Sequence, residues 1–186
     1  MSLLTISPEH QPDQGLRYAE FADISAQLQA IGVVFERWEA SYQFAADADQ
    51  ATVLAAYAEP IARLQNQYGF RSVDVISLTA AHPDKVALRQ KFLAEHTHDD
   101  FEVRFFVEGC GLFYLHVGDK VYSVLCCQGD LISVPAHTRH WFDLGAEPQL
   151  KAIRLFTTPD GWVATFTGSD IGAGYPTLDQ TLAGLS

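Results

Sequence analysis

Two stretches of the sequence decide how this chain folds: residues 95–107, EHTHDDFEVRFFV, and residues 131–143, LISVPAHTRHWFD. In the first stretch, even numbers of residues separate His96, His98 and Glu102, so an extended strand points all three side chains to one side. The second stretch contains His137 and His140. Imidazole and carboxylate groups are ligands that divalent transition metals accept. The two stretches therefore predict strands that share a metal site.

A polar, solvent-facing strand is the alternative interpretation of the first stretch. Its neighbours argue against that alternative, because Phe101, Val103, Phe105 and Phe106 are apolar on both faces. A carboxylate placed among such residues needs a partner. In the second stretch His137 has the opposite parity to His140, which favours a turn position for His137 over a place among the ligands.

The rest of the chain surrounds these stretches with short β-rich runs and a few helices. Turn residues such as Gly, Pro and Asp separate the runs, which is typical of an antiparallel sandwich or barrel. The predicted strands are 33–39, 73–78, 101–107, 112–117, 121–126, 131–134, 150–156 and 162–166. Apolar spacing predicts helices over 23–31, 51–68 and 84–92, with Gly32 ending the first and Pro60 kinking or splitting the second.

Composition limits the class of protein. The 186 residues suit one domain, and 48 % hydrophobic residues with 19 % charged residues indicate a globular chain. A net charge of −11 disfavours nucleic acid and anionic membrane surfaces as partners. The N-terminus lacks the features of a signal peptide, and three cysteines, two of them adjacent, do not suggest a disulfide framework. We therefore expect reduced thiols and a cytoplasmic location.

The two opening stretches also resemble the paired motifs of the cupin superfamily. His96-x-His98-x3-Glu102-x6-Gly109 resembles the first motif, and Gly129-x5-Pro135-x-His137-x2-His140 resembles most of the second. The sequence departs from those motifs at Gln90, His137 and Leu144, none of which is a ligand position. The resemblance implies a mainly β fold with flanking α-helices, a double-stranded β-helix (jelly-roll) barrel. It suggests a single cupin domain over 1–186, with an N-terminal α/β portion of about 1–94 packing on a barrel of about 95–170.

A narrower resemblance is to the acireductone dioxygenase family of methionine salvage. It rests on the same two stretches together with 33–38, 74–78 and 161–168, and it extends from about residue 31 to residue 175. It implies that His96, His98, Glu102 and His140 hold one divalent metal, Fe(II) or Ni(II). The implied activity cleaves an acireductone with O2, giving a 2-keto acid and formate with iron, or a carboxylic acid, formate and carbon monoxide with nickel.

Further residues are candidates for contact with an anionic acireductone. Arg104 lies two residues after Glu102, so it should face the same side and pair with the substrate's charge. The alternative is a structural ion pair with a nearby carboxylate such as Asp100 or Glu95. Arg154 lies in an apolar strand, where either substrate contact or a structural ion pair is open. Phe92, Phe142 and Trp162 are candidates for a pocket wall. Glu95 and Asp99 flank the ligands and could orient them or accept protons.

Two other functions remain open at this stage. A cupin that binds a ligand without catalysis would use the same pocket, and a cupin isomerase or decarboxylase would use the same metal ligands. In the favoured interpretation the partners are a small acireductone and O2, without nucleic acid or membrane, and the chain is a monomer.

Overall fold

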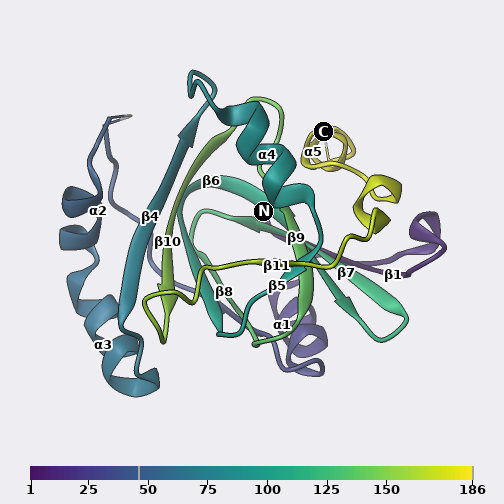
Figure 1. Ribbon diagram of the computed structural model, residues 1–186, viewed down its shortest axis with the longest axis horizontal. Coiled ribbons are helices and arrows are strands. Elements are labelled where there is room, and N and C mark those ends of the chain that lie inside the picture. Colours follow the sequence, from purple (N-terminus) through teal and green to yellow (C-terminus); the bar gives the residue numbers. More distant parts are fainter. Residues whose placement is uncertain (46, 186) are drawn as a thin grey trace.

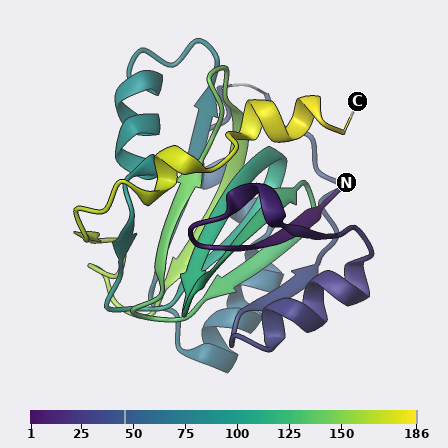
Figure 2. The same ribbon diagram turned by 90° about the vertical axis from the view of Figure 1, so that its right-hand side faces the viewer.

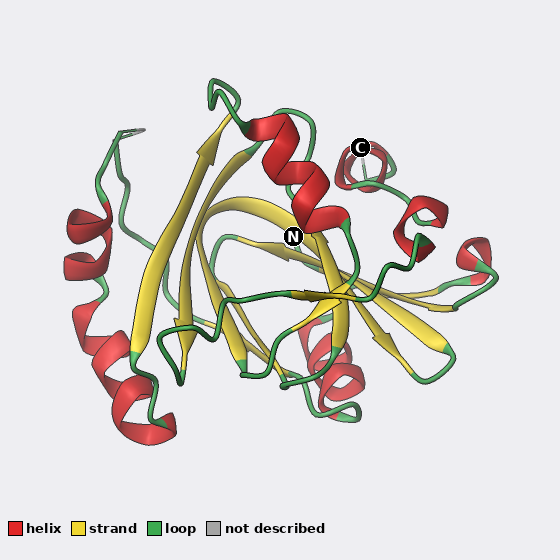
Figure 3. Ribbon diagram, viewed as in Figure 1, coloured by secondary structure: helices red, strands yellow, loops and turns green. Residues whose placement is uncertain are grey.

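Antiparallel strands dominate the computed structural model, which describes residues 1–45 and 47–185 (Figures 1 and 3). The strands are β1 (Leu3–Pro8), β2 (Leu16–Tyr18), β3 (Val34–Arg37), β4 (Ser72–Thr79), β5 (His96–Thr97), β6 (Glu102–Val117), β7 (Lys120–Cys127), β8 (Asp130–Val134), β9 (Arg139–Asp143), β10 (Gln149–Phe156) and β11 (Thr165–Phe166). The helices are η1 (Pro12–Gln14), α1 (Phe21–Gln29), α2 (Gln50–Ala56), α3 (Ala58–Tyr68), α4 (Lys85–Leu93), η2 (Ile171–Gly174) and α5 (Leu178–Ala183). The predicted class, mainly β with flanking helices, is confirmed.

The strands form two antiparallel sheets that share β6. One sheet has the order β11-β5-β9-β6-β7-β1-β2, and the other joins β4, β10, β6, β8 and β3. The N-terminal portion thus contributes strands as well as helices, because β1, β3 and β4 pair with β7, β8 and β10. A strand common to both sheets closes them around one interior.

Strand β6 passes from one sheet to the other through a β-bulge. Opposite β10, Lys151 pairs with Glu108 and Ala152 pairs with Phe106, so Val107 is the extra residue. The bulge changes which residues face inward: Phe106 belongs to the interior cluster before it, and Phe113 belongs to the same cluster after it. Gly109 has a φ of +73°, and a Cβ there would meet the Gln149 carbonyl, so only glycine fits this bend.

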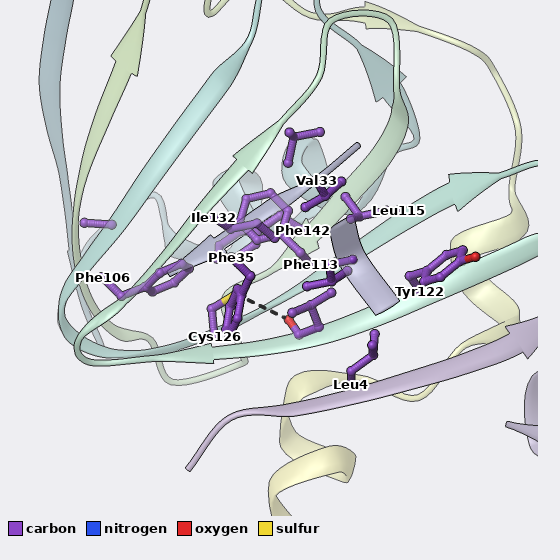
Figure 4. Close-up of a cluster of buried hydrophobic side chains, with 14 of the residues drawn as sticks. Leu4, Val33, Phe35, Phe106, Phe113, Leu115, Tyr122, Cys126, Ile132 and Phe142 are labelled. Atoms are coloured by element: carbon purple, nitrogen blue, oxygen red, sulfur yellow. Dashed lines mark hydrogen bonds between the residues drawn. The ribbon is translucent and has the colours of Figure 1, made fainter. Parts of the chain in front are cut away.

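The interior between the sheets is filled mainly by apolar side chains. Figure 4 shows Phe35, Phe106, Phe113, Ile132 and Phe142 packed together there. Helix α1 adds two fully buried residues to this cluster, Ile24 and Leu28. Burial of such side chains is the main favourable contribution to folding, at about 1.5–3 kcal/mol each.

The outer faces of both sheets are covered as well. Helices α2 and α3 lie against β4 in Figure 1, and their Val53 and Leu64 join a cluster with Val103 and Ile153. On another side, shown in Figure 2, the C-terminal segment with α5 lies near β1; Leu178 packs in a cluster with Leu3 and Leu125. Among the described residues, no helix is long and apolar enough to cross a membrane.

Several predicted elements differ from the structure. The helix predicted over 51–68 is two helices that meet at Tyr57, not at Pro60, because a proline in the first turn of α3 lacks only an N–H that has no partner there. The predicted strands 101–107 and 112–117 are one strand, because the glycines at 109 and 111 bend it without ending it. Only Thr165–Phe166 of the predicted strand 162–166 pairs. The strands β1, β2 and β9 and helix α5 were not predicted.

The expectation of three reduced thiols is wrong in this structure. Cys110 and Cys127 form a disulfide, while Cys126 is free and buried. The two partners lie directly opposite each other on β6 and β7, with Cα atoms 4.1 Å apart. The sequence shows the adjacent pair Cys126 and Cys127, but it does not show the cross-strand register that brings residue 110 to residue 127.

A candidate metal centre inside the barrel

A cavity of about 390 Å³ opens into the barrel interior beside the shared strand β6. Strands β5, β6 and β9 provide polar groups to its wall, whereas α4 and the segment 157–168, here called the strap, provide mostly apolar ones. In Figures 1 and 3 the strap crosses in front of the barrel strands before η2. The residues that line the cavity are Lys91, Phe92, His96, His98, Glu102, Arg104, Phe113, His140, Phe142, Arg154, Trp162, Val163, Ala164 and Phe166.

Three buried histidines gather at this cavity, each with one ring nitrogen within 4.8 Å of the others. His96 lies on β5, His98 follows that strand, and His140 lies on β9 directly opposite His96. Their exposed fractions are 6 %, 7 % and 2 %. The sequence predicted that His96 and His98 face one side; they do so even though the strand ends at Thr97.

Backbone carbonyls fix the orientation of all three imidazole rings. His96 Nδ1 is 2.7 Å from Ala94 O, His140 Nδ1 is 2.7 Å from Thr138 O, and His98 Nδ1 is 2.8 Å from Val163 O. A carbonyl only accepts, so each Nδ1 donates and each Nε2 keeps a free lone pair. His96 and His140 are thus oriented from their own strands, whereas His98 is oriented from the strap.

The carboxylate of Glu102 lies between the Nε2 atoms. Its Oε2 is 3.4 Å from His98 Nε2 and 3.4 Å from His140 Nε2, and its Oε1 accepts from Arg104 Nη2. His140 Nε2 is buried and has no hydrogen-bond partner among the described residues. A buried, unpartnered lone pair is costly unless something binds it. Nitrogen and oxygen donors that converge without bonding one another fit a first-row divalent ion.

The electrostatics of the site keep His96 and Glu102 in states that bind a cation. Burial, followed by the proximity of His140, lowers the pKa of His96 to about 4, so the ring is neutral at pH 7. Burial alone would raise the pKa of Glu102, but the charge of Arg104, followed by the nearby His140 and His98 imidazoles, holds it well below its usual range. Burial lowers the pKa of His98, and Glu102 outweighs burial so that the net shift is upward.

Arg104 reaches the cavity from β6, on the same side as Glu102, as its spacing predicted. It is 3 % exposed, and its guanidinium lies over the rings of Phe113 and Phe142, at 4.7 Å and 4.4 Å from their centroids. Its Nε and Nη1 have no hydrogen-bond partner among the described residues. The neighbours considered from the sequence, Asp100 and Glu95, do not pair with it; Glu102 does. Arg104 therefore retains donors for an anion.

Arg154 also borders the cavity but is committed elsewhere. Its Nε and Nη2 donate to the carboxylate of Asp74 at 2.9 Å and 2.7 Å, across the β10–β4 pair. Of the two roles left open by the sequence, the structure shows this ion pair. The sequence could not reveal it, because Asp74 lies 80 residues away.

The aromatic candidates all border the cavity. Phe92 of α4 meets Phe142 of β9 edge to face, with ring centroids 6.3 Å apart. Trp162 lies on the strap, where its side chain is 48 % exposed. The sequence analysis missed five other lining residues: Lys91, Phe113, Val163, Ala164 and Phe166. Their side chains carry no metal-ligand chemistry, and Val163 acts on His98 through its backbone carbonyl, which no sequence pattern marks.

The residues flanking the ligands have different environments. Glu95 is 2 % exposed and pairs with His116, whereas the side chain of Asp99 is 91 % exposed and lies 3.5 Å from His137. His137 has a φ of +61° and an exposed side chain, and its N–H donates to His98 O, as befits a turn position. Asp100 accepts from the N–H groups of Thr157 and Thr158 and so ties the start of the strap to the ligand segment.

Comparisons with known proteins agree with this geometry. The model of the ARD/ARD′ family matches residues 5–164. The chain is 61 % identical to the acireductone dioxygenase of Methylococcus capsulatus over 98 % of both chains, and 54 % identical to that of Pseudomonas aeruginosa over 97 % of this chain and all of the other.

A solved structure is similar throughout. It is an acireductone dioxygenase from Bacillus anthracis with a cadmium ion in its active centre, with a TM-score of 0.78 and 35 % identity over 89 % of this chain and 98 % of the other. The family resemblance and the cupin barrel expected from the sequence are thereby confirmed. This chain belongs to the acireductone dioxygenase family.

Proposed function

We propose that this protein is a metal-dependent dioxygenase that cleaves an acireductone with O2. The observation that carries the proposal is the convergence of three Nε2 lone pairs and the Glu102 carboxylate on a cavity that Arg104 enters with unpaired donors. The names of its relatives specify the substrate class. The fold and the family membership of the chain do not depend on this proposal.

The metal ligands in this proposal are His96, His98, Glu102 and His140. When bound, a divalent ion supplies a Lewis acid and a template for two oxygens of an enediolate. The protein's part is to present neutral Nε2 atoms, which the Nδ1–carbonyl hydrogen bonds secure, and an ionised carboxylate. Ligands of this kind accept both Fe(II) and Ni(II), so we propose either ion as the cofactor, one per chain.

Arg104 is the group that would bind the anionic substrate. Its Nε–H and Nη1–H are free to donate, and a buried cation stabilises an enediolate more strongly than a solvated one would. Arg154, held by Asp74, adds positive charge near Arg104 without offering the same fork of donors. Phe92, Phe142 and Trp162 provide apolar surface for a thioether tail.

The flanking carboxylates take separate roles in this proposal. Glu95 is buried and orients the ligand segment, while Asp99 is exposed and is the one of the two that can exchange protons with solvent. That assignment stays a prediction, as do a cytoplasmic location and a monomeric state. A thiol titration of protein purified under anaerobic conditions bears on the location, because a reducing compartment would give three free thiols in place of one.

The deciding experiment reconstitutes the metal-free protein separately with Fe(II) and Ni(II). With an acireductone and O2 we expect a 2-keto acid and formate from the iron form, and a carboxylic acid, formate and carbon monoxide from the nickel form. If neither form consumes O2, the dioxygenase activity is contradicted and the binding module is favoured. If both forms give the same products, the dioxygenase activity holds and the dependence of products on the metal does not.

A further inference from the structure

The strand that carries the first two histidines has little backbone support. Strand β5 is two residues long and pairs with β9 through His96 alone and with β11 through two residues. By contrast, the stretch of β6 after the bulge is held on both edges by the ladders of β7 and β9. The ladder of β5 alone therefore does not explain why His96 and His98 occupy a fixed place.

Glu95, just before His96, supplies the missing support through its side chain. The carboxylate lies 2.8 Å from His116 Nδ1 and accepts a hydrogen bond of 2.8 Å from Thr167 Oγ1. Its backbone carbonyl accepts from Thr167 N at 3.0 Å. One residue thus connects the ligand strand to β6 on one side and to the end of the strap on the other.

His116 forms the fixed end of this connection. It lies on β6 opposite Arg139, one residue after Leu115, which faces His140. It is 6 % exposed, and its second ring nitrogen lies 2.6 Å from Glu9 Oε2. A carboxylate oxygen accepts the hydrogen bond of a ring N–H, and His116 Nε2 also lies 3.4 Å from Arg139 Nη2. Charge-assisted contacts of this kind are stronger than neutral hydrogen bonds.

We infer that His116 is a positioning residue for the metal centre, acting through Glu95 on the strand of His96 and His98. An imidazole that only fills space needs no carboxylate at each ring nitrogen. A histidine held between Glu9 and Glu95 fixes the position of Glu95. The inference rests on the proposed metal site, and it assigns to His116 no contact with substrate.

The test measures metal affinity directly. His116→Gln and Thr167→Val each remove one of the two side-chain contacts of Glu95. Thr167 lies at an exposed edge, so Thr167→Val still tests the inference if the protein with the buried change His116→Gln does not fold. Removal of a group that orients a metal ligand typically weakens binding about 10–100-fold. We expect such a rise in the Kd for Ni(II), measured by competition with a chelator, and a changed visible absorption spectrum of the Co(II)-loaded protein. Both changes act on Glu95, so the double variant should weaken binding by less than the product of the two single effects.

Two control variants separate positioning from stability. Asp130→Asn disrupts a buried cluster with Ser2 and Arg37 at the start of β8, so it should lower the melting temperature and leave the Kd unchanged. Glu147→Gln, on a 70 % exposed side chain, should change neither. If His116→Gln and Thr167→Val lower the melting temperature but keep the wild-type Kd and Co(II) spectrum, the positioning role is overturned while the proposed function stands. A wild-type protein that binds no divalent metal contradicts the proposed function itself.

Discussion

The two sides of the cavity are built differently. On the barrel side, Glu102, Arg104 and His140 are at most 3 % exposed and lie on strands held by extended ladders. On the strap side, Trp162, Val163 and Phe166 are 48 %, 50 % and 49 % exposed, and only two residues of the strap pair with a strand. Glu102, Arg104 and His140 thus lie on the side with extended ladders, and much of the apolar surface is on the side with less support.

This difference separates two tasks. Charged groups in a low-dielectric interior must be held in place, since a misplaced charge there is costly. Apolar contact with a substrate tail tolerates small displacements, and a segment with few contacts is the part of a protein that opens most easily. We therefore expect substitutions in the barrel wall to have large effects and substitutions in the strap to have small ones.

The largest effect is expected from Glu102→Gln. The change removes a proposed metal ligand and leaves the buried Arg104 guanidinium without its partner, which typically costs about 3–5 kcal/mol of stability. Metal affinity should fall by more than the ~100-fold that loss of a neighbouring hydrogen bond can cause. Metal content and thermal unfolding of the metal-free protein measure the two effects. Asp99→Asn is the matched control, because its side chain is exposed beside the same ligand segment. A variant that retains wild-type affinity would remove Glu102 from the ligand set.

Arg104→Ala tests whether the wall also binds the substrate's charge. We expect kcat/KM to fall roughly 10²-fold or more, the scale for loss of a group that stabilises developing charge, while metal content is retained. Arg104→Lys should restore only part of the activity, because an ammonium cannot present the planar fork of donors. Steady-state kinetics on metal-loaded protein measure both. If Arg104→Ala keeps wild-type turnover, the role of Arg104 is structural and it does not bind the substrate's charge.

Asp143→Asn tests whether stability of the wall can be separated from its chemistry. This fully buried carboxylate on β9 accepts from Arg89 at 2.7 Å and 2.9 Å and from the N–H groups of Gly145 and Leu178. We expect about 3 kcal/mol of destabilisation at pH 7, the lower range for a broken buried pair. Denaturant unfolding measures it, and metal affinity should not change.

The same residue predicts a pH dependence with a definite sign. Burial would raise the pKa of Asp143, but the hydrogen bonds from Arg89, Leu178 and Gly145 lower it below its usual range. Its contribution to stability is therefore complete above the unfolded pKa of about 3.9 and is lost as the pH falls through the folded pKa. The difference between wild type and Asp143→Asn should shrink below about pH 4. A difference that stays constant down to pH 2 would refute the role of the ionised carboxylate.

The smallest effect is expected on the strap, from Trp162→Ala. The side chain is already half exposed, so its loss should remove about 1 kcal/mol of apolar contact, corresponding to a roughly fivefold rise in KM with little change in kcat. Val163→Ala is the control, because the backbone carbonyl that orients His98 is retained. A large fall in kcat for Trp162→Ala would show that the strap takes part in catalysis and would remove the contrast between the two sides.

The sequence predicted the site better than it predicted the fold around it. The alternation of side chains along a strand was sufficient to predict that His96, His98 and Arg104 face one cavity, because side-chain direction along a strand is a local property. Family resemblance supplied the link to His140, on a different strand. The pairing of Arg154 with Asp74 and the support of His98 by Val163 depend on contacts 80 and 65 residues apart, which no local pattern encodes.

Two errors have the same cause. The glycines around Cys110 were interpreted as the end of a strand, although they allow β6 to bend and continue. The cysteines were interpreted as free thiols, although that continuous strand places Cys110 opposite Cys127. Local turn propensity and cysteine count cannot substitute for strand register, which is set by tertiary packing.

The bulge at Val107 also constrains which sequences can evolve here. Phe106 and Phe113 are seven residues apart, so a regular strand would place them on opposite faces, and the extra residue brings both into the interior. If the strand lost the bulge while keeping its length, either Glu102 and Arg104 would leave the cavity or Phe113 and Leu115 would leave the interior. Substitutions that cannot follow the bend, such as Gly109→Val, should therefore abolish the site, while the exposed hairpin tip at Gly118 and Asp119 should accept changes.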